Sequence, residues 1–164
     1  MVKTIEIRGA NAFDTFSRVR EGCRGIVIRD GRMLISHEVN VDCCLIPGGG
    51  LEEGETPENC CVREIGEETG YIVRPTAHFL TLKEYYEEYQ YVSHYFLCDV
   101  IGITAQNLTA NEIKRGLTPV WIEPEKMLRL FARHQDYAAT NEERRGAYLR
   151  EFTALTEYFR MFGA

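Results

Sequence analysis

Residues 49–71 read GGLEEGETPENCCVREIGEETGY, a glycine-rich lead-in followed by a segment dense in glutamate. Glu64 and Glu68 are four residues apart and Glu67 is three from Glu64, so a helix places these carboxylates on roughly one face. Like charges at this spacing repel, and Arg63 neutralises only part of the charge. A bound divalent cation with oxygen ligands resolves the conflict, and Mg²⁺ or Mn²⁺ is the hard ion that such a site takes.

Short-range signals mark both ends of this helix. Thr56 provides a hydroxyl N-cap, and Pro57 after it has the backbone angle of a first helical turn. Gly70 is a typical C-cap because glycine adopts the left-handed conformation without strain. The sequence therefore predicts a helix over residues 57–69.

Strand patterns lie on both sides of this helix. Residues 23–39 read as a hairpin, because the pair Asp30-Gly31 is favoured where both turn residues need positive φ. Residues 105–116 read as a loop or a short helix, and an amphipathic helix over 141–162 closes the chain. The other expected elements are strands at 3–8, 43–46, 72–82, 90–100 and 119–122 and a helix at 124–132.

This order of elements predicts a mixed α/β sandwich. A chain of 164 residues has the size of one domain, so residues 1–164 are interpreted as a single unit. The apolar stripe of the last helix is predicted to be either core or a dimer contact, which leaves a homodimer as an alternative. The stripe consists of Tyr148, Phe152, Leu155 and Phe159.

Charge and cysteine usage limit the functional classes. A net charge of −6 argues against a broad nucleic-acid surface, which needs a basic patch, but not against a small anionic substrate beside a metal ion. The six cysteines include two adjacent pairs and have no zinc-binding spacing, so we interpret them as reduced thiols. The N-terminus lacks the apolar core of a signal peptide, and no apolar run approaches the roughly 20 residues of a membrane span. We therefore expect a cytoplasmic protein without a membrane partner.

The spacing pattern G-x5-E-x7-R-E-U-x-E-E-x-G-U, where U is a bulky aliphatic residue, is the Nudix box. The chain resembles the Nudix hydrolases (MutT-like) on this motif, and the substrate subfamily stays unassigned. Tyr71 departs from the pattern, since an aliphatic residue is usual there, and this change is expected to alter packing more than chemistry. The matching residues are Gly49, Glu55, Arg63, Glu64, Ile65, Glu67, Glu68 and Gly70.

The resemblance implies an α/β/α sandwich with a mixed sheet, a catalytic loop–helix–loop and a C-terminal amphipathic helix. It also implies metal-dependent hydrolysis of a nucleoside diphosphate linked to another moiety, a nucleotide-type small molecule. Glu64 and Glu68 would be the main Mg²⁺ ligands, and Glu67 would join them or bind a second ion. The backbone carbonyl near Gly49 would contribute as well.

Two further roles follow from the same resemblance. Arg63 would orient the carboxylates by salt bridges, with Glu55 as its partner. Gly48, Gly49 and Gly50 would form the loop that passes close to metal and phosphates, where side chains would obstruct the approach.

Many members of the family use one more acidic residue as base or extra ligand, on a loop before a tryptophan-bearing strand. Glu112 fits this role best, since Trp121 marks that strand. Glu84, Glu87 and Glu88 are alternatives, and for each of the four an ordinary surface glutamate is the favoured interpretation.

Substrate hints are weaker. Tyr86 occupies a position where ADP-ribose hydrolases tend to carry proline, whereas Tyr89 falls where diadenosine polyphosphate hydrolases tend to carry tyrosine. These rings either stack on a nucleobase or pack in the strands. Arg18, Arg20 and Arg24 either face a phosphate or base, or are solvated. Two alternative functions stay open: a nucleotide-sensing Nudix fold without turnover, and a pyrophosphohydrolase of RNA 5′ ends, which the acidic charge disfavours.

Overall fold

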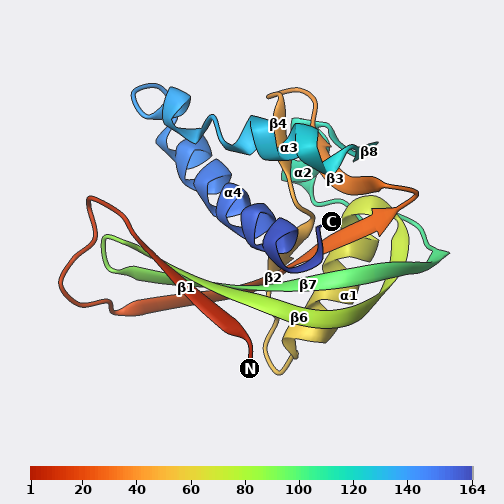
Figure 1. The fold of residues 1–164 in the computed structure, drawn as a ribbon, viewed down its shortest axis with the longest axis horizontal. Coiled ribbons are helices and arrows are strands. Elements are labelled where there is room, and N and C mark those ends of the chain that lie inside the picture. Colours follow the sequence, from red (N-terminus) through yellow and green to blue (C-terminus); the bar gives the residue numbers. More distant parts are fainter. Residues whose placement is uncertain (164) are drawn as a thin grey trace.

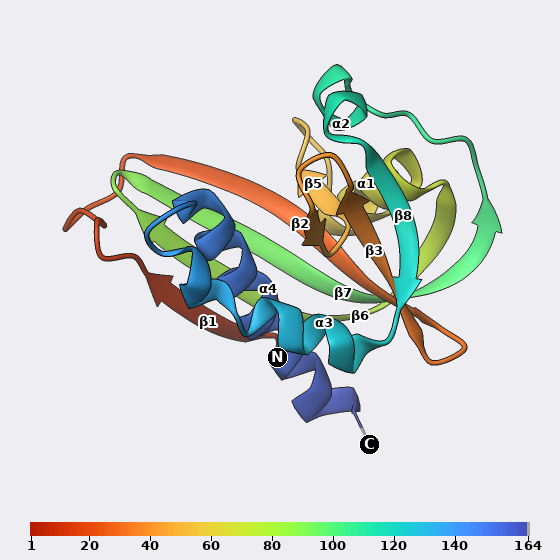
Figure 2. The ribbon, with the colours of Figure 1, turned by 90° about the horizontal axis from the view of Figure 1, so that it is seen from above.

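A mixed β-sheet with helices on both faces makes up the computed structural model, which describes residues 1–163 (Figure 1). Helix α4 (Glu142–Phe162) crosses one face and α1 (Pro57–Thr69) lies against the other, as the view from above shows (Figure 2). The strands are β1 (Lys3–Arg8), β2 (Arg18–Arg29), β3 (Arg32–Glu38), β4 (Cys43–Leu45), β5 (Gly48–Gly50), β6 (Tyr71–Tyr86), β7 (Tyr89–Ile103) and β8 (Leu117–Ile122). The remaining helices are α2 (Ala110–Arg115), α3 (Pro124–Phe131) and the short 3₁₀ helix η1 (His134–Tyr137).

The sheet follows the order β1-β6-β7-β2-β3-β4, with β5 on β2 and β8 on β3. Strand pairs β1/β6 and β2/β7 are parallel, whereas β6/β7 and β2/β3 are antiparallel. The β2–β3 turn is the predicted one, since Asp30 and Gly31 have φ of 52° and 75°. The parallel β2/β7 pair brings the first part of the chain beside its middle.

Two apolar cores lie on the two faces of the sheet. On the face covered by α3 and α4, Tyr95, Phe131 and Tyr148 are almost completely buried. On the opposite face, Ile65 of α1 packs with Phe96 of β7. Cores on both faces of one mixed sheet confirm the predicted α/β/α sandwich.

The apolar stripe of α4 belongs to the first core. Tyr148 and Leu155 are buried, and Phe152 and Phe159 are partly buried against the same cluster. Of the two alternatives for this stripe, the structure therefore supports core packing.

The β6–β7 hairpin is longer than the sequence pattern predicts. The tyrosine-rich segment 83–91 lies where the two expected strands meet. In the structure it extends both strands, and only residues 87 and 88 form a tight turn, in which Glu87 has φ of 50°. Tyr86 pairs directly with Tyr89 across this turn. Backbone pairing needs no alternation of polar and apolar residues, which explains why the pattern ends too early.

The glycines at 48–50 form strand β5, so the expected loop is wrong at this position. They pair antiparallel with β2, with Cys23 opposite Gly49 and Arg24 opposite Gly48. The two backbones approach so closely that a Cβ on Gly48 would lie 2.0 Å from the Cys23 carbonyl oxygen. Only glycine fits this contact, and the contact places β5 directly beside α1.

None of the helices in residues 1–163 combines the length and the apolar character needed to cross a membrane.

Candidate active site

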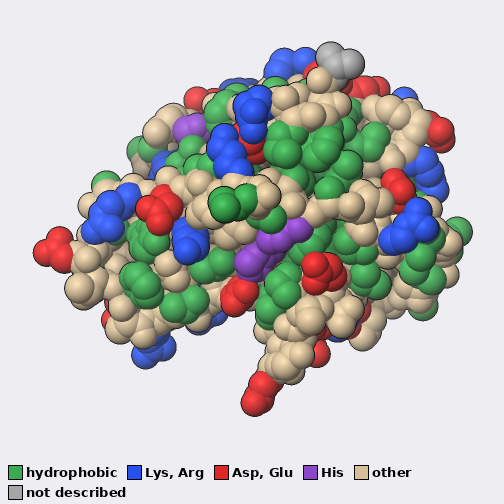
Figure 3. All heavy atoms as spheres, turned by 60° about the horizontal axis from the view of Figure 1, so that its bottom comes forward, with side chains coloured by type: hydrophobic (Ala, Val, Ile, Leu, Met, Phe, Trp, Pro, Cys, Tyr) green, Lys and Arg blue, Asp and Glu red, His purple; other side chains and the backbone are tan. Residues whose placement is uncertain are grey.

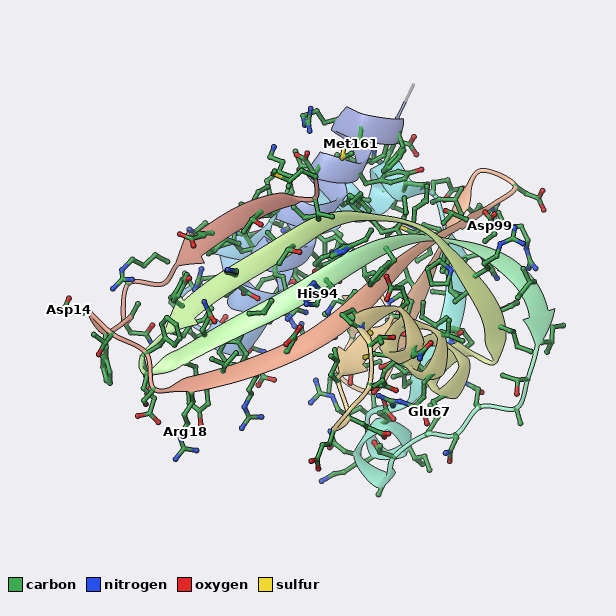
Figure 4. The ribbon with its side chains drawn as sticks, turned by 90° about the horizontal axis from the view of Figure 1, so that it is seen from below. Asp14, Arg18, Glu67, His94, Asp99 and Met161 are labelled. Carbon is green, nitrogen blue, oxygen red and sulfur yellow. The ribbon has the colours of Figure 1, made fainter. Side chains whose placement is uncertain are left out.

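Helix α1 begins and ends where the sequence predicts. The Thr56 hydroxyl accepts a hydrogen bond from the Asn59 backbone (3.2 Å), and Gly70 closes the helix with φ of 76°. The Gly70 N–H donates to the Gly66 carbonyl at 2.9 Å. These caps fix the two ends of α1 and therefore the positions of the glutamates along it. Figure 4 shows α1, with Glu67 labelled, beside β2 and β7, with the connection carrying α2 beyond it.

Gly49 passes directly against the carboxylate of Glu64. A Cβ on Gly49 would lie 2.4 Å from the carboxyl carbon and 2.5 Å from one carboxylate oxygen. A side chain at this position would have to displace the Glu64 carboxylate. The backbone of β5 and a carboxylate of α1 therefore share one small space, as expected for a carbonyl and a carboxylate that act on the same ligand.

Arg63 is the hub of the acidic cluster. Its guanidinium forms a bidentate pair with Glu55, at 2.7 and 2.9 Å, and donates to the Gly50 carbonyl at 3.0 Å. Its Nη1 donates to Glu64 at 2.9 Å and to Glu67 at 3.3 Å. These bonds lower the pKa of Glu55 to about 2 and raise that of Arg63. This is the pairing that the sequence predicts for Arg63 and Glu55.

Glu68 is nearly buried and turned away from Arg63. Its carboxylate accepts hydrogen bonds from the Ser36 hydroxyl (3.1 Å) and the Gly48 N–H (3.2 Å). Burial, opposed by Arg24, raises the pKa of Glu68 to about 8, and the nearby carboxylates add to the rise. Burial likewise raises the pKa of Glu64.

The donor set fits a hard divalent cation. Within residues 1–163, no group of three His, Cys, Asp or Glu side chains converges into a ready-made metal site, and Arg63 donates to both Glu64 and Glu67. However, the half-buried Glu64 carboxylate, the buried Glu68 carboxylate and the Gly49 carbonyl are the kind of oxygen donors that Mg²⁺ prefers. Burial raises the pKa of both carboxyls and so disfavours their charged forms. A bound cation would favour those charged forms.

Glu112, predicted as a base or extra ligand, takes part in a helix cap. Its carboxylate accepts a hydrogen bond from the Thr109 N–H (2.8 Å), and the Thr109 hydroxyl accepts one from the Glu112 N–H (3.2 Å), which forms a capping box. Glu112 still acts on Glu68 through space, since its charge raises the pKa of that carboxyl. Among the alternatives, Glu84 is buried and lines a cavity, whereas Glu88 pairs with Arg18 at the surface.

A cavity of about 660 Å³ lies beside this cluster. Gly49 and Gly50 form part of its wall, so the cavity and the acidic cluster adjoin the same strand, β5. Of the three arginines in question, Arg20 and Arg24 line it, whereas Arg18 does not. Its other lining residues include Glu21, Cys23, Glu84, Tyr86, Tyr91 and Arg150.

Tyr86 lines this cavity, but Tyr89 does not. Instead, the guanidinium of Arg20 lies over the Tyr89 ring, 5.4 Å from its centroid, and that of Arg18 lies 5.8 Å from the same centroid. Tyr89 is therefore a packing residue of the hairpin, whereas Tyr86 is placed to contact a ligand.

The carboxylate of Glu151, on α4, anchors the chain just before β5. It is fully buried and accepts hydrogen bonds from the Ile46 N–H (2.6 Å) and the Tyr95 hydroxyl (2.7 Å). Arg24 donates to the Ile46 carbonyl at 2.6 Å, so the backbone N–H and the carbonyl of Ile46 are both hydrogen-bonded. Sequence reasoning missed Glu151, because nothing distinguishes it from the surface glutamates of the same helix.

Two histidines lie on the α1 side of the sheet, where His78 stacks on Phe96 of the core beneath α1. His94, labelled in Figure 4, is hydrogen-bonded to Glu21 at 2.6 Å. The Thr81 hydroxyl lies 3.4 Å from His94 and 3.2 Å from His78 and bridges the two rings. Figure 3 shows histidine side chains in the middle of this face, among hydrophobic ones. Burial lowers the pKa of His78, so this residue is a neutral packing partner of the Phe96 ring, at 4.7 Å.

The departure from the box at Tyr71 is absorbed by packing. Its hydroxyl accepts a hydrogen bond from the Trp121 indole (3.1 Å), and the two rings meet edge to face at 5.4 Å. The Arg29 guanidinium lies over both rings. Tyr71, the first residue of β6, thus packs against β8 without entering the acidic cluster.

Comparison with known proteins identifies the family. A NUDIX domain model matches residues 20–142, so the chain belongs to the Nudix family. The ADP-ribose pyrophosphatase of Methanocaldococcus jannaschii is 31% identical over 105 residues, which cover 61% of this chain and 62% of that protein. The RNA pyrophosphohydrolase of Sphingopyxis alaskensis is 38% identical over 52 residues, 29% of this chain and 33% of that protein. The chain thus spans less than two thirds of the length of these curated relatives.

Solved structures share the fold. A NUDIX hydrolase from Nitrosomonas europaea superimposes with a TM-score of 0.59 at 17% identity, covering 84% of this chain and 90% of that one. The E. coli ORF135 protein superimposes with a TM-score of 0.55 at 19% identity, covering 85% and 91%. The predicted family and fold are confirmed.

Proposed function

We propose that this chain hydrolyses a pyrophosphate linkage in a nucleotide-type small molecule, with Mg²⁺ as cofactor and Mn²⁺ as the alternative ion. One observation carries the proposal: Gly49 both contacts the Glu64 carboxylate and lines the cavity. A ligand that reaches the Gly49 end of the cavity would lie next to the acidic cluster. A cavity of about 660 Å³ is also in the range of small-molecule sites.

The residues of the acidic cluster have distinct tasks in this reaction. Glu64, Glu68 and the Gly49 carbonyl would hold the metal, with Glu67 beside them. A bound divalent cation supplies positive charge to the phosphoryl oxygens and lowers the pKa of a water molecule. Arg63 keeps the Glu64 and Glu67 carboxylates in place, and a carboxylate of the cluster not used as a ligand accepts the proton of the attacking water.

The cavity supports an anionic, nucleotide-sized substrate. Arg24 and Arg150, whose side chains are only 16% and 17% exposed, line the cavity, and guanidinium groups bind phosphate oxygens well. Tyr86 and Tyr91 provide aromatic surface for a nucleobase. The name of the M. jannaschii relative points to the same class of substrate.

Hydrolysis at RNA 5′ ends is the second candidate. Two relatives named RNA pyrophosphohydrolase favour it, but their matches cover only 29% and 26% of this chain. The net charge of −6 opposes a long contact with an RNA backbone. A small-molecule substrate is therefore the better proposal.

A product screen with Mg²⁺ tests the proposal. Nucleoside triphosphates, sugar nucleotides, dinucleoside polyphosphates, ADP-ribose and 5′-triphosphorylated RNA would be compared by chromatography of the products. We expect turnover of a small nucleotide, lost by about 10³-fold or more in Glu68→Gln and kept in Glu53→Gln, an exposed control beside the box. Equal rates in the two variants would contradict the assignment. Tight nucleotide binding without any product would instead support a sensing module.

A further inference from the structure

Four of the six cysteines gather between α1 and the sheet, directly beneath β5. All six are free and buried in the structure. Cys60 and Cys61 of α1 meet Cys23 of β2 and Cys98 of β7 in one apolar cluster. The contacts within this group are unequal: the sulfurs of Cys23 and Cys60 are 2.7 Å apart, whereas those of Cys61 and Cys98 are 3.7 Å apart.

The short pair is close to bonding distance. A disulfide joins its sulfurs at about 2.05 Å, so Cys23 and Cys60 need to approach by only roughly 0.7 Å, against roughly 1.7 Å for Cys61 and Cys98. The two thiols come from different elements, a strand and a helix, which are held together by the packing of the domain. Within one cluster, the structure therefore offers a near pair and a matched distant pair.

The near pair has access to small molecules. Cys23 is only 1% exposed to bulk solvent, but it forms part of the wall of the 660 Å³ cavity. Cys60 is completely buried behind it. A small oxidant that enters the cavity meets Cys23 first and has Cys60 directly behind as the second thiol.

The pair is also in contact with the acidic site. Cys23 is paired with Gly49 in the sheet, and the Cys60 thiol donates to the Gly49 carbonyl at 3.6 Å. Cys60 precedes Glu64 by four residues, so the two lie on the same face of α1. A bond between the sulfurs would remove the S–H donor of the Gly49 carbonyl and tie β2 to α1 across that residue.

From this geometry we infer that Cys23 and Cys60 form a redox-active dithiol, which a small hydroperoxide oxidises to a disulfide that slows hydrolysis at the adjacent site. The chemistry runs in two steps. The Cys23 sulfur attacks one peroxide oxygen: an S–O bond forms, the O–O bond breaks, and the other oxygen leaves as an alcohol or water with the thiol proton. The Cys60 sulfur then attacks the Cys23 sulfur: the S–S bond forms, the S–O bond breaks, and hydroxide leaves as water with the Cys60 proton. The thiols lose two electrons, and the peroxide gains them.

Peptide mapping of the full-length protein tests the dithiol independently of any activity. Reduced protein is treated with hydrogen peroxide, blocked with iodoacetamide and digested with trypsin and Glu-C. We expect a crosslink between residues 22–24 and 59–63 that lacks two hydrogen atoms and disappears on treatment with dithiothreitol. Because the second peptide holds both Cys60 and Cys61, variants assign the partner: the crosslink should be lost in Cys60→Ser and kept in Cys61→Ser.

The Cys98→Ser variant is the matched control for a thiol lost from the same buried cluster, and circular dichroism verifies that each variant is folded. A crosslink between Cys61 and Cys98 in place of the near pair would overturn the inference. So would oxidation of Cys23 to sulfinic or sulfonic acid without any crosslink.

The effect on hydrolysis rests on the proposed function and is measured separately. We expect kcat of the crosslinked protein to fall by about tenfold or more, because active-site displacements of about 1 Å cost roughly 10²-fold. Dithiothreitol should restore the rate, and Cys60→Ser should keep its own untreated rate under peroxide. A crosslinked protein with unchanged kcat would overturn the regulatory part. A chain without hydrolytic activity would refute the proposed function and leave the peptide map to decide on the dithiol.

Discussion

Replacing Glu151 by glutamine tests whether α4 holds the active-site backbone through a buried charge. The carboxylate of Glu151 is completely buried and accepts hydrogen bonds from Ile46, Tyr95 and Arg150, at 2.6, 2.7 and 3.0 Å. The Arg24 guanidinium lies 3.8 Å away. These contacts connect α4 to the segment that enters β5. We expect Glu151→Gln to destabilise the whole domain.

The magnitude follows from the donors around the two oxygens. All three hydrogen-bonding groups are donors, so the amide nitrogen of glutamine must face at least one of them, and that bond is lost. A hydrogen bond to a charged group contributes about 1.5–3 kcal/mol. The neighbouring guanidiniums also lose their buried counter-charge, and breaking a buried ion pair costs about 3–5 kcal/mol. We therefore expect the free energy of unfolding to fall by about 3–5 kcal/mol, a large part of the usual 5–15 kcal/mol.

Urea denaturation followed by circular dichroism measures this loss. The midpoint should fall while the slope stays the same, since the surface exposed on unfolding does not change. Calorimetry should show a melting temperature lower by about 10 °C. Glu125→Gln, at an exposed position of α3, is the control and should change stability by no more than about 0.5 kcal/mol. A loss below about 1 kcal/mol in Glu151→Gln would refute the reasoning, because it would mean that the buried charge has no structural role.

Two further variants probe the acidic site. Gly49→Ala places a methyl carbon 2.4 Å from the Glu64 carboxyl carbon and should lower kcat by about 10²-fold. Gly50→Ala is the control and should retain the rate, because its methyl carbon would lie 4.0 Å from the nearest neighbouring atom. Equal kcat values in the two variants would contradict the role of the close approach at Gly49. Glu55 pairs with a guanidinium that lowers its pKa from 4.5 to about 2, so this pairing stabilises the fold above pH 4.5 and is lost as the pH falls toward 2. Urea titrations over this window should show a flatter pH dependence in Glu55→Gln than in the wild type, and identical slopes would show that the pair does not stabilise the fold.

The helix of the acidic site could be predicted because its determinants are local. Thr56, Pro57 and Gly70 mark its ends through hydrogen bonds and backbone angles that involve only nearby residues. Spacing along the chain is sufficient for features of this kind. The pairing of Arg63 with Glu55 also spans only eight residues, but it was implied by the resemblance to the Nudix box and not by spacing alone.

The arrangement of the carboxylates could not be predicted in the same way. Helix spacing correctly places the three glutamates on α1, but it does not show that Glu68 turns toward Ser36 and Gly48, 32 and 20 residues away. These partners lie on β3 and β5, which helix periodicity does not describe. The role of Glu112 stays a prediction, and its capping contact with Thr109 is a feature that its position before Trp121 did not indicate.

Sequence spacing cannot predict the cavity, because residues from distant parts of the chain line it. Its walls combine β2, β5, β6 and β7 with α4, and Ile46 and Glu151, which fix α4 against the entry to β5, are 105 residues apart. Members of a family that share the Nudix box share the means of polarising a phosphoryl group. In our proposal, side chains outside the box, such as Arg24 and Arg150 of the cavity wall, surround the rest of the ligand. Substrate identity should therefore follow changes on β2 and α4 more closely than changes in the box, and an exchange of α4 residues between relatives should alter KM for different nucleotides while the metal requirement stays the same.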